Sequence, residues 1–90
     1  MKALDHTGSF KRDLKRITKR RYDLAKLAHV LRLLQTETPL PASCRPHALK
    51  GRWAGFRECH IEPDWLLIYQ IGTTRIVLVR TGTHSDLFGE

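Results

Sequence analysis

The residue types best suited to proton transfer lie in the second half of this 90-residue chain. They are three histidines, one aspartate and one arginine, namely His47, His60, Asp64, Arg80 and His84. Imidazole titrates near neutral pH and can act as acid or base, and arginine can hold two phosphate oxygens while it stays charged. In metal-free RNA cleavage, a ribose 2′-hydroxyl attacks the neighbouring phosphorus, a base takes its proton and an acid protonates the leaving 5′-oxygen. These five side chains are sufficient for that reaction.

Each of the five residues also has an ordinary structural explanation. His47 follows Pro46 and is compatible with a loop, His60 with a hydrogen-bonded strand position, and Asp64 with the cap of a turn. Arg57 and Arg80 have acidic residues nearby with which to pair, namely Glu58, Glu62 and Asp86. For any one residue alone the structural explanation is favoured, so the functional hypothesis depends on the five side chains meeting in space.

The elements that must bring these residues together read as short strands separated by turns. Turn signals occur at Gly51, at Ala54-Gly55, at Glu62-Pro63 and at Gly72-Thr73. The apolar run from Trp65 to Ile71 predicts a buried central strand, and residues 75–81 predict its hairpin partner. Arg80 and His84 then lie at the far end of that partner. Because each turn reverses the chain, the polar side chains of one strand are expected to return towards those of the strand before it.

The first half of the chain predicts helices. Residues 2–6 are compatible with an edge strand, and Thr7 or Ser9 can cap a helix whose apolar residues Phe10, Leu14 and Ile17 share one face. A second helix is expected from a cap at Asp23 to about Gln35, with an apolar stripe made by Leu24, Leu27, Ala28, Leu31 and Leu34. The short connection at Arg21-Tyr22 predicts an antiparallel pair of helices.

The whole chain, residues 1–90, is expected to form one domain. Residues 36–46 contain three prolines and read as a loop that crosses from the helices to the sheet. The predicted fold is therefore α+β, with two N-terminal antiparallel helices packed on a small, twisted, mainly antiparallel sheet.

Positive charge is concentrated in one short stretch. The chain has 16 basic and 9 acidic residues, a formal net charge of +7, and residues 11–21 alone carry a net of +6. The basic residues of this stretch are Lys11, Arg12, Lys15, Arg16, Lys19, Arg20 and Arg21. Such concentration favours a surface for phosphates or an acidic partner over a merely solvated helix face.

No signal pattern or membrane-spanning run is apparent, so we expect a soluble, cytoplasmic protein with no membrane partner.

The two cysteines do not indicate a disulfide framework or a metal centre. Cys44 with His47, and Cys59 with His60, supply ligand types, but Cys59 and His60 are adjacent and point to opposite faces of a strand. We therefore predict reduced thiols, no metal and no other cofactor.

Four aromatic residues lie near the charged cluster in sequence, namely Trp53, Trp65, Tyr69 and Phe88. Aromatic side chains can stack on unpaired bases. Trp65 and Tyr69 fall in the most apolar run and are expected to be core at least in part, whereas no apolar pattern demands Phe88. Phe88 is thus the better candidate for stacking.

Two ungapped blocks of sequence resemble the YafQ-type toxins of the RelE/ParE superfamily of bacterial toxin-antitoxin systems. The first, from His47 to Tyr69, reads H-x-L-x-G-x-W-x-G-F-R-x-x-H-I-E-P-D-W-L-L-I-Y, and the second, from Arg80 to Gly89, reads R-T-G-T-H-x-x-L-F-G. The resemblance implies a RelE-like α+β fold and a ribosome-dependent endoribonuclease that cuts mRNA in the ribosomal A site without a metal. It also implies a cognate antitoxin of the DinJ or RelB type, through which the complex represses its operon by binding operator DNA.

The resemblance further implies an active site made of His47, His60, Asp64, Arg80 and His84. In this scheme Arg80 neutralises the phosphate, His84 is the acid, Asp64 or His47 is the base and His60 orients them. Trp65 and Phe88, with Arg57, are expected to bind the substrate, and the basic stretch of residues 11–21 to bind rRNA. Two alternatives stay open, a non-enzymatic gyrase inhibitor like the ParE relatives and a basic RNA-binding module, and neither explains the acid-base cluster.

Overall fold

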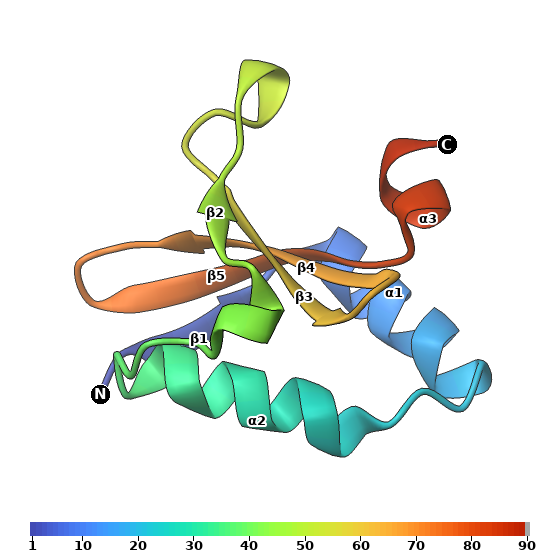
Figure 1. Ribbon diagram of the computed structural model, residues 1–90, viewed down its shortest axis with the longest axis horizontal. Helices are drawn as coiled ribbons and strands as arrows, with labels where there is room; N and C mark the ends of the chain where they lie inside the picture. The colour runs from blue at the N-terminus through green and yellow to red at the C-terminus, as the bar shows by residue number, and fades with distance from the viewer. Residues whose placement is uncertain (90) are drawn as a thin grey trace.

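Local sequence signals account for most elements of the computed structural model, which describes residues 1–89. In chain order they are β1 (Ala3–His6), α1 (Gly8–Lys19), α2 (Leu24–Gln35), β2 (His47–Ala48), β3 (Arg57–Glu62), β4 (Trp65–Ile71), β5 (Arg75–Gly82) and α3 (His84–Phe88) (Figure 1). Short 3-10 turns at Ala42–Cys44 and Gly51–Trp53 flank β2. The predicted α+β class is confirmed.

The helix starts follow from the expected caps. The Thr7 side chain accepts a hydrogen bond from the Phe10 amide at 3.0 Å, and the Asp23 side chain accepts one from the Ala25 amide, also at 3.0 Å. Each bond satisfies an amide that the first helical turn leaves without a partner. Helix α2 ends at Gln35 as expected, but its buried residues are Leu27, Val30 and Leu34, whereas Leu24 and Ala28 of the predicted stripe are exposed.

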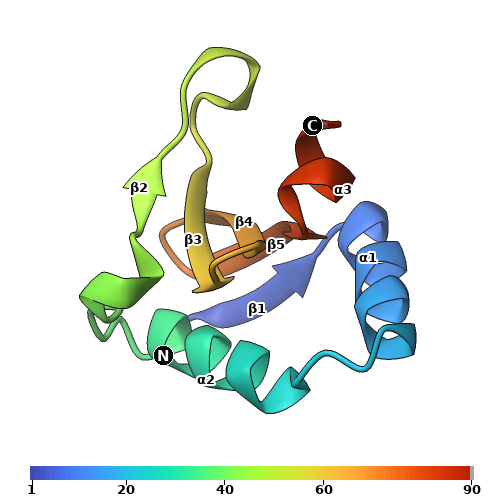
Figure 2. The same ribbon diagram turned by 45° about the vertical axis from the view of Figure 1, so that its right-hand side comes forward.

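The two N-terminal helices diverge after their short connection. Arg21 adopts a left-handed φ of 61° between them. Beyond that point α1 and α2 run at a wide angle to each other rather than side by side (Figures 1 and 2). Because of this divergence α1 packs along β5, while α2 contacts β3 and β5.

The five strands of the described residues form one sheet in the order β1-β5-β4-β3-β2. The last three pairings are antiparallel, as expected, but β1 pairs with β5 in parallel, with Ala3 opposite Arg75 and His6 opposite Leu78. The predicted edge strand at residues 2–6 is therefore real. Its parallel pairing makes the sheet mixed.

Alternation along β4 separates two apolar layers. Trp65, Leu67 and Tyr69 pack with α1 and α2 in the main core, whereas Leu66 and Ile68 face the opposite side. That opposite side carries Leu87 with Leu49, Trp53, Phe56, Val79 and Phe88. The loop between β2 and β3 rises on the same side as α3, away from α2 (Figure 2). We call the side that carries Leu66 and Ile68 the open face.

No helix among the described residues is long and apolar enough to cross a bilayer.

Candidate active site on the open face

Strand register places the chemically active side chains in two rows on the open face. In the first row, His47 lies opposite Glu58, Glu58 opposite Ile68, and Ile68 opposite Arg80. In the second row, His60 lies opposite Leu66, which lies opposite Gly82, two residues before His84. Residues paired across neighbouring strands point to the same face of a sheet. The predicted histidines and Arg80 therefore share a face.

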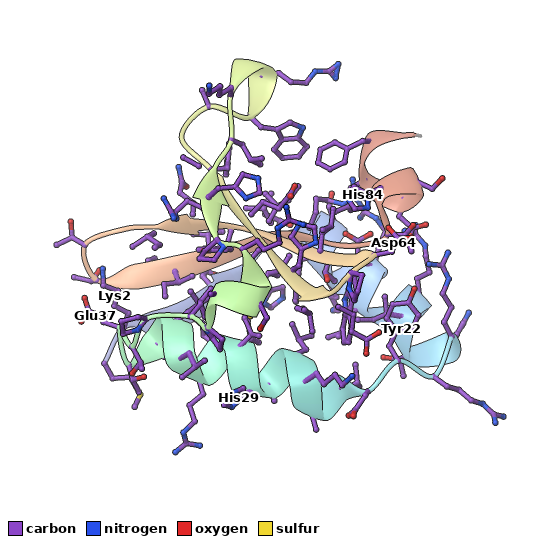
Figure 3. All side chains as sticks on the ribbon, viewed as in Figure 1. Lys2, Tyr22, His29, Glu37, Asp64 and His84 are labelled. Carbon is purple, nitrogen blue, oxygen red and sulfur yellow. The ribbon has the colours of Figure 1, made fainter. Side chains whose placement is uncertain are left out.

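Asp64 and His84 form a direct pair at the end of these rows. The Nδ1 atom of His84 lies 2.6 Å from Oδ1 of Asp64, and the backbone amide of His84 donates to the same oxygen at 3.0 Å. Figure 3 shows the two residues together at the α3 end of the molecule, far from Lys2 and Glu37. His84 opens α3, so its amide is one of those that the helix leaves free. Both bonds, the backbone one first, lower the pKa of Asp64 below its ordinary value of 3.8.

His60 adjoins this pair. Its ring centroid lies 5.9 Å from that of His84, and its Nδ1 lies 3.2 Å from the carbonyl oxygen of Pro63. His47 is held in the same way, with Nδ1 2.8 Å from the carbonyl oxygen of Arg45. The Nε2 atoms of both rings approach Glu58 Oε1, at 3.5 Å for His47 and 3.8 Å for His60. The sequence suggested Glu58 only as an ion-pair partner for an arginine, although it lies two positions before His60 and thus on the same side of β3.

Arg80 is fixed by an acidic residue of the basic helix. Its Nε and Nη2 atoms donate to Asp13 at 2.6 and 3.1 Å, and the Thr81 amide donates to Asp13 at 3.1 Å. Asp13 is only 1% exposed. The bond from Thr81 satisfies a β5 amide that β1 is too short to reach. The hydrogen bonds from Arg80 to Asp13 raise the pKa of the Arg80 guanidinium, which therefore stays charged.

Helix α3, which carries His84, is anchored at its start. Thr83 and Asp86 form a reciprocal capping box, and Arg20 donates to the two carboxylate oxygens of Asp86 at 2.7 and 3.1 Å. The Arg20 hydrogen bonds, followed by those from Thr83, hold the pKa of Asp86 well below its usual range. Gly82 is needed here because its φ is +151° and an added Cβ would lie 2.8 Å from Asp86 Oδ2.

Two residues expected to bind substrate lie on the other side of the sheet. Trp65 is 1% exposed, donates to Thr81 at 2.9 Å and packs edge-on against Tyr22. Arg57 lies opposite Tyr69, a core residue, because odd positions of β3 point towards the helices. These positions contradict the predicted substrate contacts of Trp65 and Arg57, because the sheet itself separates both from the histidines.

Phe88, predicted to stack on the substrate, lies on the open face. It packs edge-on against Trp53 with the ring centroids 6.4 Å apart, and Trp53 packs in the same way against Phe56 at 5.8 Å. Phe88 and Trp53 are both partly exposed. They form an aromatic rim between α3 and the β2–β3 loop.

The basic residues of α1 and its end divide into two groups. All seven are exposed, but Arg16 pairs with Asp13 at 3.3 Å and with Asp86 at 3.8 Å, and Arg20 also binds Asp86. These two arginines therefore have structural partners within the fold. The other five take part in none of the ion pairs found in the described residues, which leaves them better suited to bind phosphates; they are Lys11, Arg12, Lys15, Lys19 and Arg21.

The cysteines are buried and unpaired with each other. Burial raises the pKa of Cys59 to about 12 and also raises that of Cys44. Within residues 1–89 there is no group of three or more histidine, cysteine or acidic side chains arranged to hold a metal ion.

Comparison with known proteins decides the family. Residues 2–89 match the family model described as the bacterial toxin of type II toxin-antitoxin system, YafQ. The chain belongs to the YafQ toxin family. The mRNA interferase toxin YafQ of Escherichia coli K12 is 42% identical over 87 residues, which cover 96% of this chain and 95% of the relative.

Solved structures of YafQ toxins share the fold throughout. The crystal structure of YafQ from E. coli BL21(DE3) superposes with a TM-score of 0.93 at 40% identity, covering 99% of this chain and 100% of the other. The toxin in the E. coli DinJ-YafQ complex gives a TM-score of 0.90, also at 40% identity, with the same coverage. Family membership thus rests on sequence and fold over nearly the whole chain.

Proposed function

We propose that this YafQ-family protein is an mRNA interferase, a ribosome-dependent endoribonuclease that cuts mRNA in the A site. The observation that carries the proposal is the Asp64–His84 pair with His60 at a ring distance of 5.9 Å, on the face shared by His47 and Arg80. The name and 42% identity of the E. coli relative support the same activity.

In the proposed mechanism His84 is the general acid. Its Nδ1 faces the Asp64 carboxylate, so the protonated ring presents its Nε2–H to the leaving 5′-oxygen. Asp64 orients the ring and stabilises its charge, as the acidic member of other catalytic carboxylate–histidine pairs does. The lowered pKa of Asp64 argues against this carboxylate as the base, because a weaker base abstracts a proton less readily.

The base is then His47 or His60. A carbonyl oxygen can only accept, so the contacts to Arg45 and Pro63 require both rings to carry their proton on Nδ1 when neutral. Each Nε2 then has a lone pair available for a 2′-hydroxyl. Arg80 supplies positive charge to the phosphate through Nη1, since Asp13 occupies Nε and Nη2.

The small open face also supports dependence on the ribosome. A chain of 90 residues offers few walls around a long message, and rRNA would supply the remainder while the exposed lysines of α1 bind its phosphates. We further propose a cytoplasmic toxin silenced by a DinJ- or RelB-like antitoxin, with operator DNA bound through the antitoxin. The DinJ-YafQ complex of the E. coli relative supports that partnership.

The test compares programmed ribosomes with the same mRNA free in solution, followed by mapping of the cut ends. Cleavage only on ribosomes is expected. No cleavage in either arm would favour a non-enzymatic inhibitor or an RNA-binding module. A message with a single 2′-deoxy sugar at the cut site should resist cleavage, and normal cutting of that message would exclude the 2′-hydroxyl as nucleophile.

A further inference from the structure

Glu58 is a buried carboxylate between two imidazoles. It is 6% exposed, and its Oε1 atom lies 3.5 Å from Nε2 of His47 and 3.8 Å from Nε2 of His60. The two histidines come from different strands, β2 and β3, and meet only through this residue among the contacts described above. A buried carboxylate needs positive charge or hydrogen-bond donors nearby, and the two rings can provide both.

The Nδ1 contacts of His47 and His60 determine how each ring can interact with Glu58. Both Nδ1 atoms face backbone carbonyls, so a neutral ring turns an unprotonated Nε2 towards Glu58, which cannot donate as a carboxylate. When either ring takes a proton on Nε2, its positive charge lies 3.5 or 3.8 Å from Oε1. An opposite charge within about 4–6 Å favours the charged form of a group.

We propose that Glu58 is a positioning residue that serves both histidines as a shared counter-ion. Whichever ring takes the proton from the 2′-hydroxyl, the Glu58 carboxylate stabilises the resulting imidazolium. In this role Glu58 abstracts no proton. The proposal rests on the ribonuclease function and adds to it a reason why either ring can serve as the general base.

The surroundings of Glu58 leave this role to the two histidines. Besides His47 on β2 and His60 on its own strand, the charged residue in its row is Arg80, which lies beyond Ile68 and is held by Asp13. The thiol of Cys59 is adjacent in the chain but points into the opposite core.

The kinetic test replaces Glu58 with glutamine, which keeps the size of the side chain and removes its charge. We expect kcat for ribosome-bound message to fall about tenfold or more while KM and thermal unfolding stay close to those of the parent protein. Glu58→Asp should restore part of the loss. Glu62→Gln, on the same strand but paired with Lys26, is the matched control and should retain activity.

Double and triple variants test whether Glu58 serves both histidines. Glu58→Gln should still lower kcat when added to His47→Ala or to His60→Ala, since one ring remains in each, and should add little when both rings are absent. An unchanged kcat in Glu58→Gln, or a loss confined to KM or to folding, would overturn the proposal.

A second measurement does not depend on cleavage. In a pH titration the 13Cδ resonance of Glu58 should shift when the neighbouring rings change charge, and this component of the shift should vanish in the His47→Ala/His60→Ala variant. A Glu58 resonance that moves in the same way in the parent protein and in the double variant would refute the shared counter-ion. If the resonance moves but no variant or parent cleaves mRNA, the proposed function fails while the ionic coupling stands.

Discussion

Arg20, the residue that caps the end of α1, donates to both carboxylate oxygens of Asp86 in α3, at 2.7 and 3.1 Å. Asp86 also caps the helix whose first residue is His84. The basic helix is therefore attached to the element that carries the proposed general acid, and not all of its positive charge is free for rRNA.

This attachment predicts different effects for two neighbouring basic residues. Arg20→Ala should lower cleavage by about tenfold to a hundredfold, because small displacements of a catalytic group cost that much. Lys19→Ala removes the same charge without that partner, and should weaken ribosome binding and reduce its salt dependence by about one unit of slope. Single-turnover cleavage and binding at several salt concentrations separate the two. Equal effects of both variants on the cleavage step would contradict the assignment.

A substitution at Gly82 tests the same anchor from the strand. Gly82→Ala combines a φ of +151° with a Cβ only 2.8 Å from Asp86, so we expect the free energy of unfolding to fall by about 1–3 kcal/mol, with a loss of cleavage. Urea denaturation measures the change. Gly55→Ala is the control, since Gly55 also has a positive φ, of +92°, but open space around it. If both variants lose the same stability, the contact with Asp86 is unimportant.

Removal of the proposed acid should affect chemistry and spare binding. His84→Ala is expected to slow cleavage by about 10²–10⁴-fold with ribosome affinity nearly unchanged. His29→Ala, at an exposed position of α2, serves as the matched control. Loss of ribosome binding in His84→Ala would reassign His84 to docking.

The lowered pKa of Asp64 predicts how acid affects the start of α3. A carboxyl group whose folded pKa lies below its unfolded value adds stability above that unfolded value, 3.8 here, and the contribution disappears as pH falls through the lower folded pKa. The Asp64 13Cγ resonance should therefore titrate with a midpoint below 3.8, and the His84 amide should lose its partner as it does. Asp64→Asn should abolish this dependence. A midpoint at or above 3.8 would show that the pair does not persist in solution.

Patterns within single elements allowed much of the fold to be predicted. Asp23 and the leucine stripe determine α2, and the apolar run from Trp65 to Ile71 gives β4 with its observed bounds. The parallel pairing of β1 with β5 depends on how α1 returns along the sheet. No local pattern in Ala3–His6 indicates that path, so the order of the strands in the sheet could not be predicted from the sequence.

The candidate site shows the same limit. Alternation on β3 puts Glu58 and His60 on one side and Arg57 on the other, and this separation was available from the sequence. The sequence did not show which side of the sheet would be open, because β4 is apolar at both odd and even positions and Trp65 is compatible with either face. The Asp13–Arg80 pair joins residues 67 positions apart and arises only from the packing of α1 on β5.

The parallel pairing of β1 with β5 has a consequence for biosynthesis. β1 is translated first, yet its hydrogen-bonding neighbour is the last strand of the sheet to be made, and α3 with His84 follows later still. A nascent chain therefore cannot close this sheet while β5 is inside the exit tunnel. If the protein acts on ribosomes as we propose, it can cut mRNA only after β5 and α3 have left the tunnel.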